Sequence, residues 1–140
     1  MKTQVWIAAA AVIAIAAGYL LLKEEDKSSL DVAAGAPLVA VKVPQLTGDA
    51  LKGEALFNDN CASCHGKNAA GRDGNGPPLI HKIYEPNHHA DGAFYLAAMR
   101  GVRAHHWTFG DMPPVEGIGQ EQVASIVTYV RTLQRENGIF

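Results

Sequence analysis

"CASCHGKN", residues 61–68, contains both cysteines of this 140-residue chain, and a histidine directly follows the second cysteine. Two cysteines at this spacing are typical of four kinds of site: a short disulfide, a redox pair, half of a zinc site, or the attachment site of a c-type haem. Each of these sites occurs in a different structural context. The surrounding sequence therefore decides which of them Cys61 and Cys64 form.

The sequence argues against the first three kinds of site. A disulfide between Cys61 and Cys64 would close a very small loop and constrain little of the unfolded chain. A thioredoxin-like pair lies in a βαβ unit, whereas this sequence shows little strand-like alternation. A structural zinc site needs four ligands, and the chain has no second C-x-x-C pair. The C-x-x-C-H pattern is the attachment signature of c-type haem, in which two thiols one helical turn apart bind two vinyl groups and His65 can bind the iron.

Residues 48–140 resemble the monohaem class I c-type cytochromes. Four motifs carry the resemblance, in the order that this family uses: GEALFNDNCASCHG, GPPL, FGDMPP and QVASIVTYVRTLQ. The resemblance implies an all-α class I cytochrome c fold, with three to five helices around one covalently bound haem c. It also implies a set of cofactor-binding residues: Cys61, Cys64, His65, Met112 and, through its carbonyl, Pro77.

The resemblance assigns the axial ligands of the haem iron. His65 would bind one face, and the Pro77 carbonyl would orient its ring by accepting a hydrogen bond. Met112 lies where the family places its axial methionine, and a thioether favours ferrous iron and so raises the reduction potential. Met99 is a rival thioether, but it lies in an apolar pattern of helical spacing, so we expect it in the core. An axial imidazole from a loop histidine, which would lower the potential, stays an alternative.

Apolar periodicity predicts three helices, over residues 49–60, 91–100 and 119–136. Asp49 is the expected N-cap of the first. The resemblance implies that the first and last helices cross closely, with Gly53 and Phe57 against Ile126 and Tyr129. The last helix also carries an apolar stripe that we expect to be buried. This stripe consists of Val123, Ile126, Val127, Val130 and Leu133.

Five further histidines lie between the two predicted axial ligands, and four of them form adjacent pairs. A second metal site, for example for copper, is one interpretation of the pairs, because imidazoles suit that metal. Adjacent histidines on a loop tend to point apart, however, and no cysteine or carboxylate pattern completes a site. We therefore expect exposed loop side chains or contacts to the haem propionates, to which Trp107 and Tyr84 could also donate. The histidines are His81, His88, His89, His105 and His106.

"VWIAAAAVIAIAAGYLLL", residues 5–22, contains no charged side chain. A helix of this length spans about 27 Å, which is enough for the hydrocarbon core of a membrane. We therefore expect a transmembrane anchor over residues 1–22 and a linker over residues 23–47, before the domain of residues 48–140. The positive charge ahead of the apolar segment favours an inner-membrane protein with its domain on the periplasmic side. A cleaved signal peptide is the alternative.

Charge and the family resemblance limit the function. The net charge is −2 and no basic stripe occurs, so the sequence lacks the footprint of a nucleic-acid-binding protein. The resemblance implies a one-electron carrier that is not an enzyme. Its expected partners are a quinol-oxidising complex or a dehydrogenase as donor, and a terminal oxidase or a reductase as acceptor. A haem enzyme or gas sensor with an open or displaceable sixth iron position is the alternative.

Overall fold

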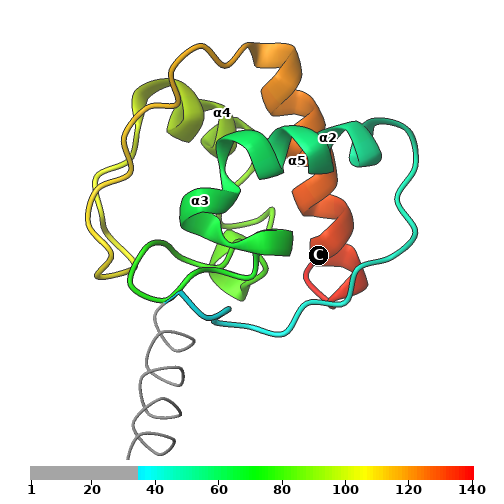
Figure 1. Ribbon diagram of the computed structural model, residues 1–140, viewed down its shortest axis with the longest axis horizontal. Helices are drawn as coiled ribbons and strands as arrows, with labels where there is room; N and C mark the ends of the chain where they lie inside the picture. Colours follow the sequence, from blue (N-terminus) through cyan, green and yellow to red (C-terminus); the bar gives the residue numbers. More distant parts are fainter. Residues whose placement is uncertain (1–34) are drawn as a thin grey trace, which may run out of the picture. The chain divides into compact units, whose positions relative to one another are not determined.

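The computed structural model describes residues 35–140, and within this range the chain forms a helical domain without β-strands (Figure 1). The three predicted helices are present, and their bounds lie within one residue of the prediction. One short helix and two 3₁₀ turns lie between the first two of them. In chain order the elements are α2 (Gly48–Asn60), α3 (Ala62–His65), η1 (Lys67–Ala69), η2 (Lys82–Tyr84), α4 (Asp91–Arg100) and α5 (Gln120–Glu136).

The predicted anchor over residues 1–22 and the first half of the predicted linker lie outside the described residues. The chain divides into two units, Met1–Ala34 and Gly35–Phe140. In the second unit, none of the helices combines the length and the apolar character that crossing a bilayer requires.

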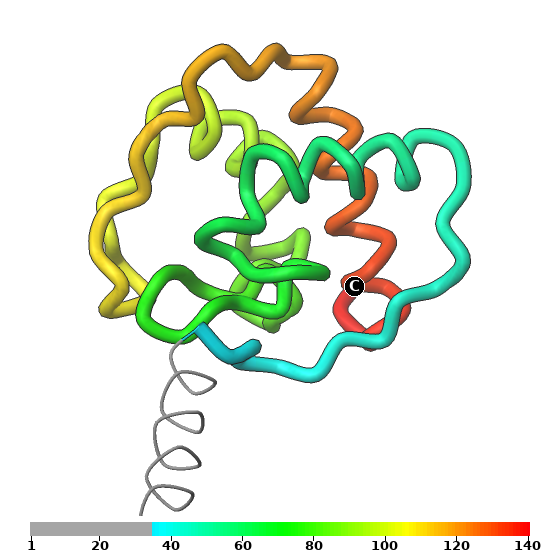
Figure 2. The backbone as a smooth tube through the Cα atoms, in the orientation of Figure 1, coloured from blue at the N-terminus to red at the C-terminus, as the bar shows by residue number. Residues whose placement is uncertain are grey.

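Residues 35–47, the second half of the predicted linker, pack against the domain. The amide of Val39 donates to the carbonyl of Ala70 at 3.1 Å. The amide of Lys42 donates to Asn137 Oδ1 at 2.9 Å, and Asn137 Nδ2 donates back to the Lys42 carbonyl at 2.8 Å. Figure 2 shows this segment passing beside the C-terminal end of the chain. No residue of this segment forms a β-strand, and three of its apolar side chains pack against the core: Val39, Val41 and Leu46.

Helices α2 and α5 cross in contact at Gly53. A Cβ atom at this position would lie 1.9 Å from the carbonyl oxygen of Ser125, so only glycine permits the approach. One turn later on α2, the ring of Phe57 packs against that of Tyr129, with centroids 5.5 Å apart. Both rings are fully buried, and each contributes about 2–3 kcal/mol through burial. The close crossing implied by the family resemblance is therefore present.

The two crossing helices begin differently. The amide of Gly119, just before α5, donates to Gln122 Oε1 at 2.8 Å and so is satisfied by a side chain of the first turn. The prediction that Asp49 caps α2 is wrong, because α2 begins at Gly48 and the residue before it is Thr47. Asp49 lies inside the first turn, where its carboxylate interacts favourably with the positive end of the helix dipole. The predicted apolar stripe of α5 is buried throughout.

Arg131 ties α5 to the loop that precedes α4. Its side chain is buried, and its Nε donates to Asp91 Oδ1 at 2.8 Å. Nη1 donates to the carbonyl of Tyr84 at 2.7 Å, and Nη2 donates to the carbonyl of His89. The guanidinium also lies 4.9 Å from the centre of the Phe94 ring. These partners compensate the buried charge of Arg131. The same hydrogen bonds fix the backbone of this loop to α5, the most buried helix.

We expect Gly53→Ala to destabilise the haem-loaded protein by about 3 kcal/mol or more, because α2 and α5 must separate to admit the methyl group. The matched control is Gly92→Ala on α4, where a Cβ atom meets nothing within 4 Å. Thermal unfolding followed by circular dichroism measures both variants. A melting temperature for Gly53→Ala equal to that of Gly92→Ala would contradict the described crossing.

Candidate haem-binding site

A largely apolar cavity of about 400 Å³ opens between the helices and the loop that joins α4 to α5. Its volume lies in the range of sites that take a cofactor. Phe57 of α2, Phe94 of α4 and Ile126 of α5 contribute to its wall, so segments distant in the sequence share it. Four of the five predicted cofactor-binding residues line this cavity, and Cys64 is exposed beside them. The four are Cys61, His65, Pro77 and Met112.

The C-x-x-C-H motif forms a helical turn directly after α2. The amide of Cys61 donates to the carbonyl of Phe57 at 2.8 Å, and the amide of His65 donates to the carbonyl of Cys61 at 2.9 Å. The thiols of Cys61 and Cys64 form no disulfide. Burial, followed by the nearby Cys64, raises the pKa of Cys61 to about 11, so its thiol is protonated at neutral pH. One turn of helix thus offers two thiols and an imidazole to the same ligand.

His65 is held in the wall of the cavity with one ring nitrogen already engaged. Its side chain is 9% exposed, and its Nδ1 donates to the carbonyl of Pro77 at 2.9 Å. The proton on Nδ1 leaves the lone pair of Nε2 for a metal. Burial lowers the pKa of His65, against an opposing effect of the Pro77 hydrogen bond, and so favours the neutral imidazole that binds iron. Gly76 permits this turn, since a Cβ there would lie 2.7 Å from the Cys64 carbonyl oxygen.

Met112 enters the cavity from the loop that joins α4 to α5. Its backbone pairs with that of Val102 through two hydrogen bonds of 2.9 Å, which form an isolated antiparallel bridge. The amide of Val115 donates to the carbonyl of Ala98 at 2.8 Å and ties the loop to α4. The prediction that Met99 is a core residue is wrong, because its side chain is 38% exposed and lies outside the cavity lining. Among residues 35–140, Met112 is therefore the thioether that shares a cavity with His65.

Trp107 presents an unpaired donor at the same site. Its ring lines the cavity, and its Nε1 is buried without a hydrogen-bond partner in the described part of the chain. A buried unpaired N–H costs about 1–3 kcal/mol. The carboxylate of a haem propionate would accept this hydrogen bond. With two thiols, one imidazole, one thioether and apolar walls, the residues at this site fit a haem in chemistry.

The expected exposure of the loop histidines is confirmed for His88, His105 and His106, but the orientation of one adjacent pair differs from the expectation. His88 and His89 both donate their amides to the carbonyl of Glu85, at 3.0 and 2.8 Å, so they share one tight turn. The prediction that adjacent histidines point apart is wrong here, because the His88 and His89 ring centroids lie 4.7 Å apart. His106 joins this pair from the loop between α4 and α5, and desolvation followed by the neighbouring imidazoles lowers its pKa. His81 lies apart from them, at the N-terminus of η2.

Comparison with known proteins gives one family. A sequence model of the cytochrome c family matches residues 50–134, more than half of the chain. The matched range contains Cys61, Cys64, His65 and Met112, and the family carries haem c bound covalently through the C-x-x-C-H motif. No curated protein and no solved structure matches this chain. The prediction of a covalent, iron-containing haem c is confirmed by the family match.

We expect the double variant Cys61→Ala/Cys64→Ala to lose its haem to acidified acetone, because no thioether bond then joins the cofactor to the chain. The unaltered protein should keep essentially all of its haem with the polypeptide under the same treatment. Each single variant serves as the matched control, since one remaining thiol still forms one bond. Haem that stays with the double variant would show that another residue attaches it.

Proposed function

The chain belongs to the cytochrome c family, and we propose that it is a one-electron carrier, not an enzyme, with its haem iron bound by His65 and Met112. One observation carries this proposal: both side chains line the cavity that also contains Cys61. An iron with both axial positions filled leaves no position for a substrate. The proposed ligands therefore favour electron transfer over the making of bonds.

The bound haem supplies a ferric/ferrous couple, and the chain sets the conditions for it. The hydrogen bond from His65 to Pro77 fixes the imidazole ring and strengthens its remaining nitrogen as a donor. Met112 offers a soft, neutral sulfur atom. The apolar walls exclude water, which disfavours the more highly charged ferric state. The Met112 sulfur atom and the apolar walls both favour a raised reduction potential. The hydrogen bond from His65 to Pro77 does not.

The proposed partners are redox proteins of a membrane. The donor is a quinol-oxidising complex or a dehydrogenase, and the acceptor is a terminal oxidase or a reductase. The apolar segment of residues 5–22 supports a location on the periplasmic side of the inner membrane, with residues 1–22 as the anchor. An anchored domain meets membrane-bound partners at a high effective concentration.

Docking of these partners is proposed to use apolar contact more than charge. Residues 48–140 contain eight Lys and Arg against ten Asp and Glu, so this range has a net charge of −2 and little means of strong positive steering. Leu96 on α4 lines the haem cavity and is nevertheless 54% exposed. An exposed apolar side chain at the cavity mouth suits a small, transient interface.

A haem enzyme or gas sensor is the second candidate function. His105 and His106 line the cavity, and either imidazole could act as a base beside an iron whose sixth position is open. This function requires that Met112 leave the iron or never bind it. The occupancy of the sixth position therefore separates the two candidates.

We expect the ferric protein to show the charge-transfer band of a methionine–iron bond and the ferrous protein to bind no carbon monoxide. Met112→Ala should lose the band and bind carbon monoxide. It should also lower the reduction potential by at least about 59 mV, which corresponds to a tenfold loss of preference for ferrous iron.

Met99→Ala is the matched control, because it removes an exposed thioether outside the cavity and should change none of these readouts. Ready binding of carbon monoxide by the unaltered protein would overturn the His65/Met112 ligation and favour the enzyme or sensor.

We expect removal of residues 1–34 to slow electron transfer with membrane-bound partners several-fold while leaving the reduction potential unchanged, because the potential is set within the haem cavity. Turnover with native membranes measures the first effect and a redox titration measures the second. Equal turnover by the shortened and full chains would contradict the proposed anchoring.

A further inference from the structure

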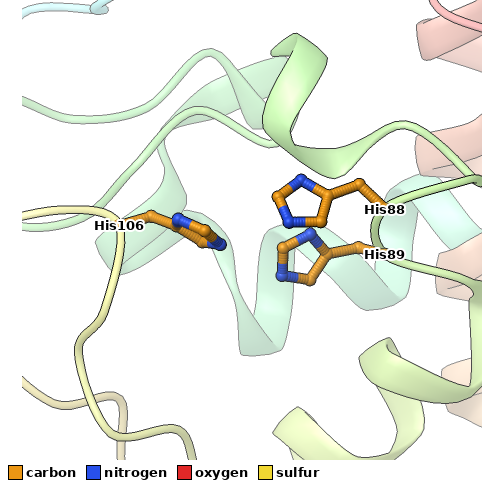
Figure 3. Close-up of side chains that lie close together, drawn as sticks. All are labelled: His88, His89 and His106. Atoms are coloured by element: carbon orange, nitrogen blue, oxygen red, sulfur yellow. The ribbon is translucent and has the colours of Figure 1, made fainter.

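Three histidines from two separate segments meet at the edge of the haem cavity. His88 and His89 come from the turn before α4, and His106 comes from the loop between α4 and α5 (Figure 3). One ring nitrogen from each lies within 4.8 Å of the others. The His106 ring centroid is 5.1 Å from that of His88 and 5.3 Å from that of His89. His89 and His106 also line the haem cavity, but none of the three belongs to the predicted set of Cys61, Cys64, His65, Pro77 and Met112.

His89 is oriented as a metal-binding histidine is. Its Nδ1 lies 2.6 Å from the carbonyl oxygen of Ile83. Because a carbonyl only accepts, Nδ1 carries the proton and Nε2 keeps a free lone pair. Histidines that bind metals nearly always donate their other N–H to such a carbonyl or to a carboxylate, which fixes the tautomer and the ring. His65 has the same arrangement with Pro77 at the predicted iron site.

The segments that carry the three rings are fixed by hydrogen bonds outside the cluster. The amides of His88 and His89 share the carbonyl of Glu85, and Arg131 donates to the carbonyl of His89. The loop of His106 is closed at its base by the bridge between Val102 and Met112. Between these points the amide of Ala104 donates to Asp111 Oδ1 at 2.8 Å. A site with such support loses little conformational entropy when an ion binds.

We propose that His88, His89 and His106 form a binding site for one divalent transition-metal ion of the class that prefers imidazole, zinc or copper. Three neutral imidazoles and one water complete a tetrahedral shell, as in zinc sites with three histidine ligands. Calcium and magnesium are excluded as natural occupants, because the cluster offers nitrogen rather than oxygen atoms. The site is separate from the iron, which uses His65 and Met112 in the proposed function.

Such an ion would act on the loop that carries Met112. His106 and Met112 belong to the same loop, whereas His88 and His89 belong to the turn that Arg131 fixes to α5. The ion would therefore join the loop of the proposed sixth ligand to the rigid part of the domain. This consequence rests on the proposed function, whereas the ion site itself does not.

The first experiment titrates ZnCl₂, and separately CuCl₂, into the full haem-loaded chain after dialysis against EDTA. Isothermal calorimetry with metal analysis should give one ion per chain. His88→Gln and His106→Gln should each weaken metal binding by more than about 100-fold. Mutation of a residue that only hydrogen-bonds a metal ligand already lowers metal affinity by about 10–100-fold, and these variants remove a ligand itself. X-ray absorption at the zinc edge should show three imidazole nitrogens at about 2.0–2.1 Å.

His105→Gln is the matched control. It removes an imidazole next to His106 that lies outside the group of three. This variant should bind zinc as the unaltered chain does. Loss of binding in His105→Gln, with binding retained in His88→Gln, would overturn the assigned ligands.

Two further results would overturn the site itself. One is the absence of stoichiometric binding of both zinc and copper. The other is a changed haem spectrum in metal-free His88→Gln, because His88 does not line the haem cavity and would then act on the haem. The methionine–iron band of the unaltered, metal-free chain is measured independently of both results, so failure of this proposal is distinguishable from failure of the proposed electron carrier.

Discussion

The contact of α2 with α5 at Gly53 is the constraint on which the rest of the domain depends. The backbones touch there because no Cβ atom separates Gly53 from the Ser125 carbonyl. The approach lets Phe57 pack against Tyr129 in the centre of the core. Phe57 in turn accepts the hydrogen bond from Cys61 that ends α2. The position of the haem-attachment motif is therefore set by a residue that has no side chain.

The two sides of the cavity are held with unequal strength. His65 lies in a helical turn joined to α2, it is buried, and its ring is fixed by Pro77. Met112 is half-buried in a loop, and its backbone is held by the bridge to Val102. A ligand on a loop is easier to displace than one on a buried helix, because fewer contacts oppose its movement. The two candidate functions, electron carrier and gas sensor, therefore differ in whether Met112 would bind the iron. In both of them His65 would have the same role.

Sequence reasoning succeeds here where the signal is local. Apolar periodicity places the three longer helices, and the C-x-x-C-H motif places the cofactor, because both depend on residues close together in the chain. It fails where contacts between residues far apart in the sequence determine the position or the exposure of a residue. Residues 35–47 carry no helical periodicity, yet they dock through apolar contacts with the core and through hydrogen bonds to Asn137 and Ala70. On α4 the small residue Ala98 faces the core, so Met99 beside it is exposed despite the apolar pattern around it.

The histidine cluster shows the same limit at the level of a site. The sequence places His88 beside His89, but their shared orientation comes from two amides that donate to Glu85, and His106 arrives from another segment. Arg131 offered a sequence signal for this turn, because it is a charged residue beside the apolar stripe of α5. A guanidinium buried at such a position needs hydrogen-bond acceptors held close to it. Those acceptors include the carbonyl of His89. The most buried helix, α5, thus holds one half of the cluster while the loop of Met112 holds the other, so any group that joins the halves also restrains the weaker side of the cavity.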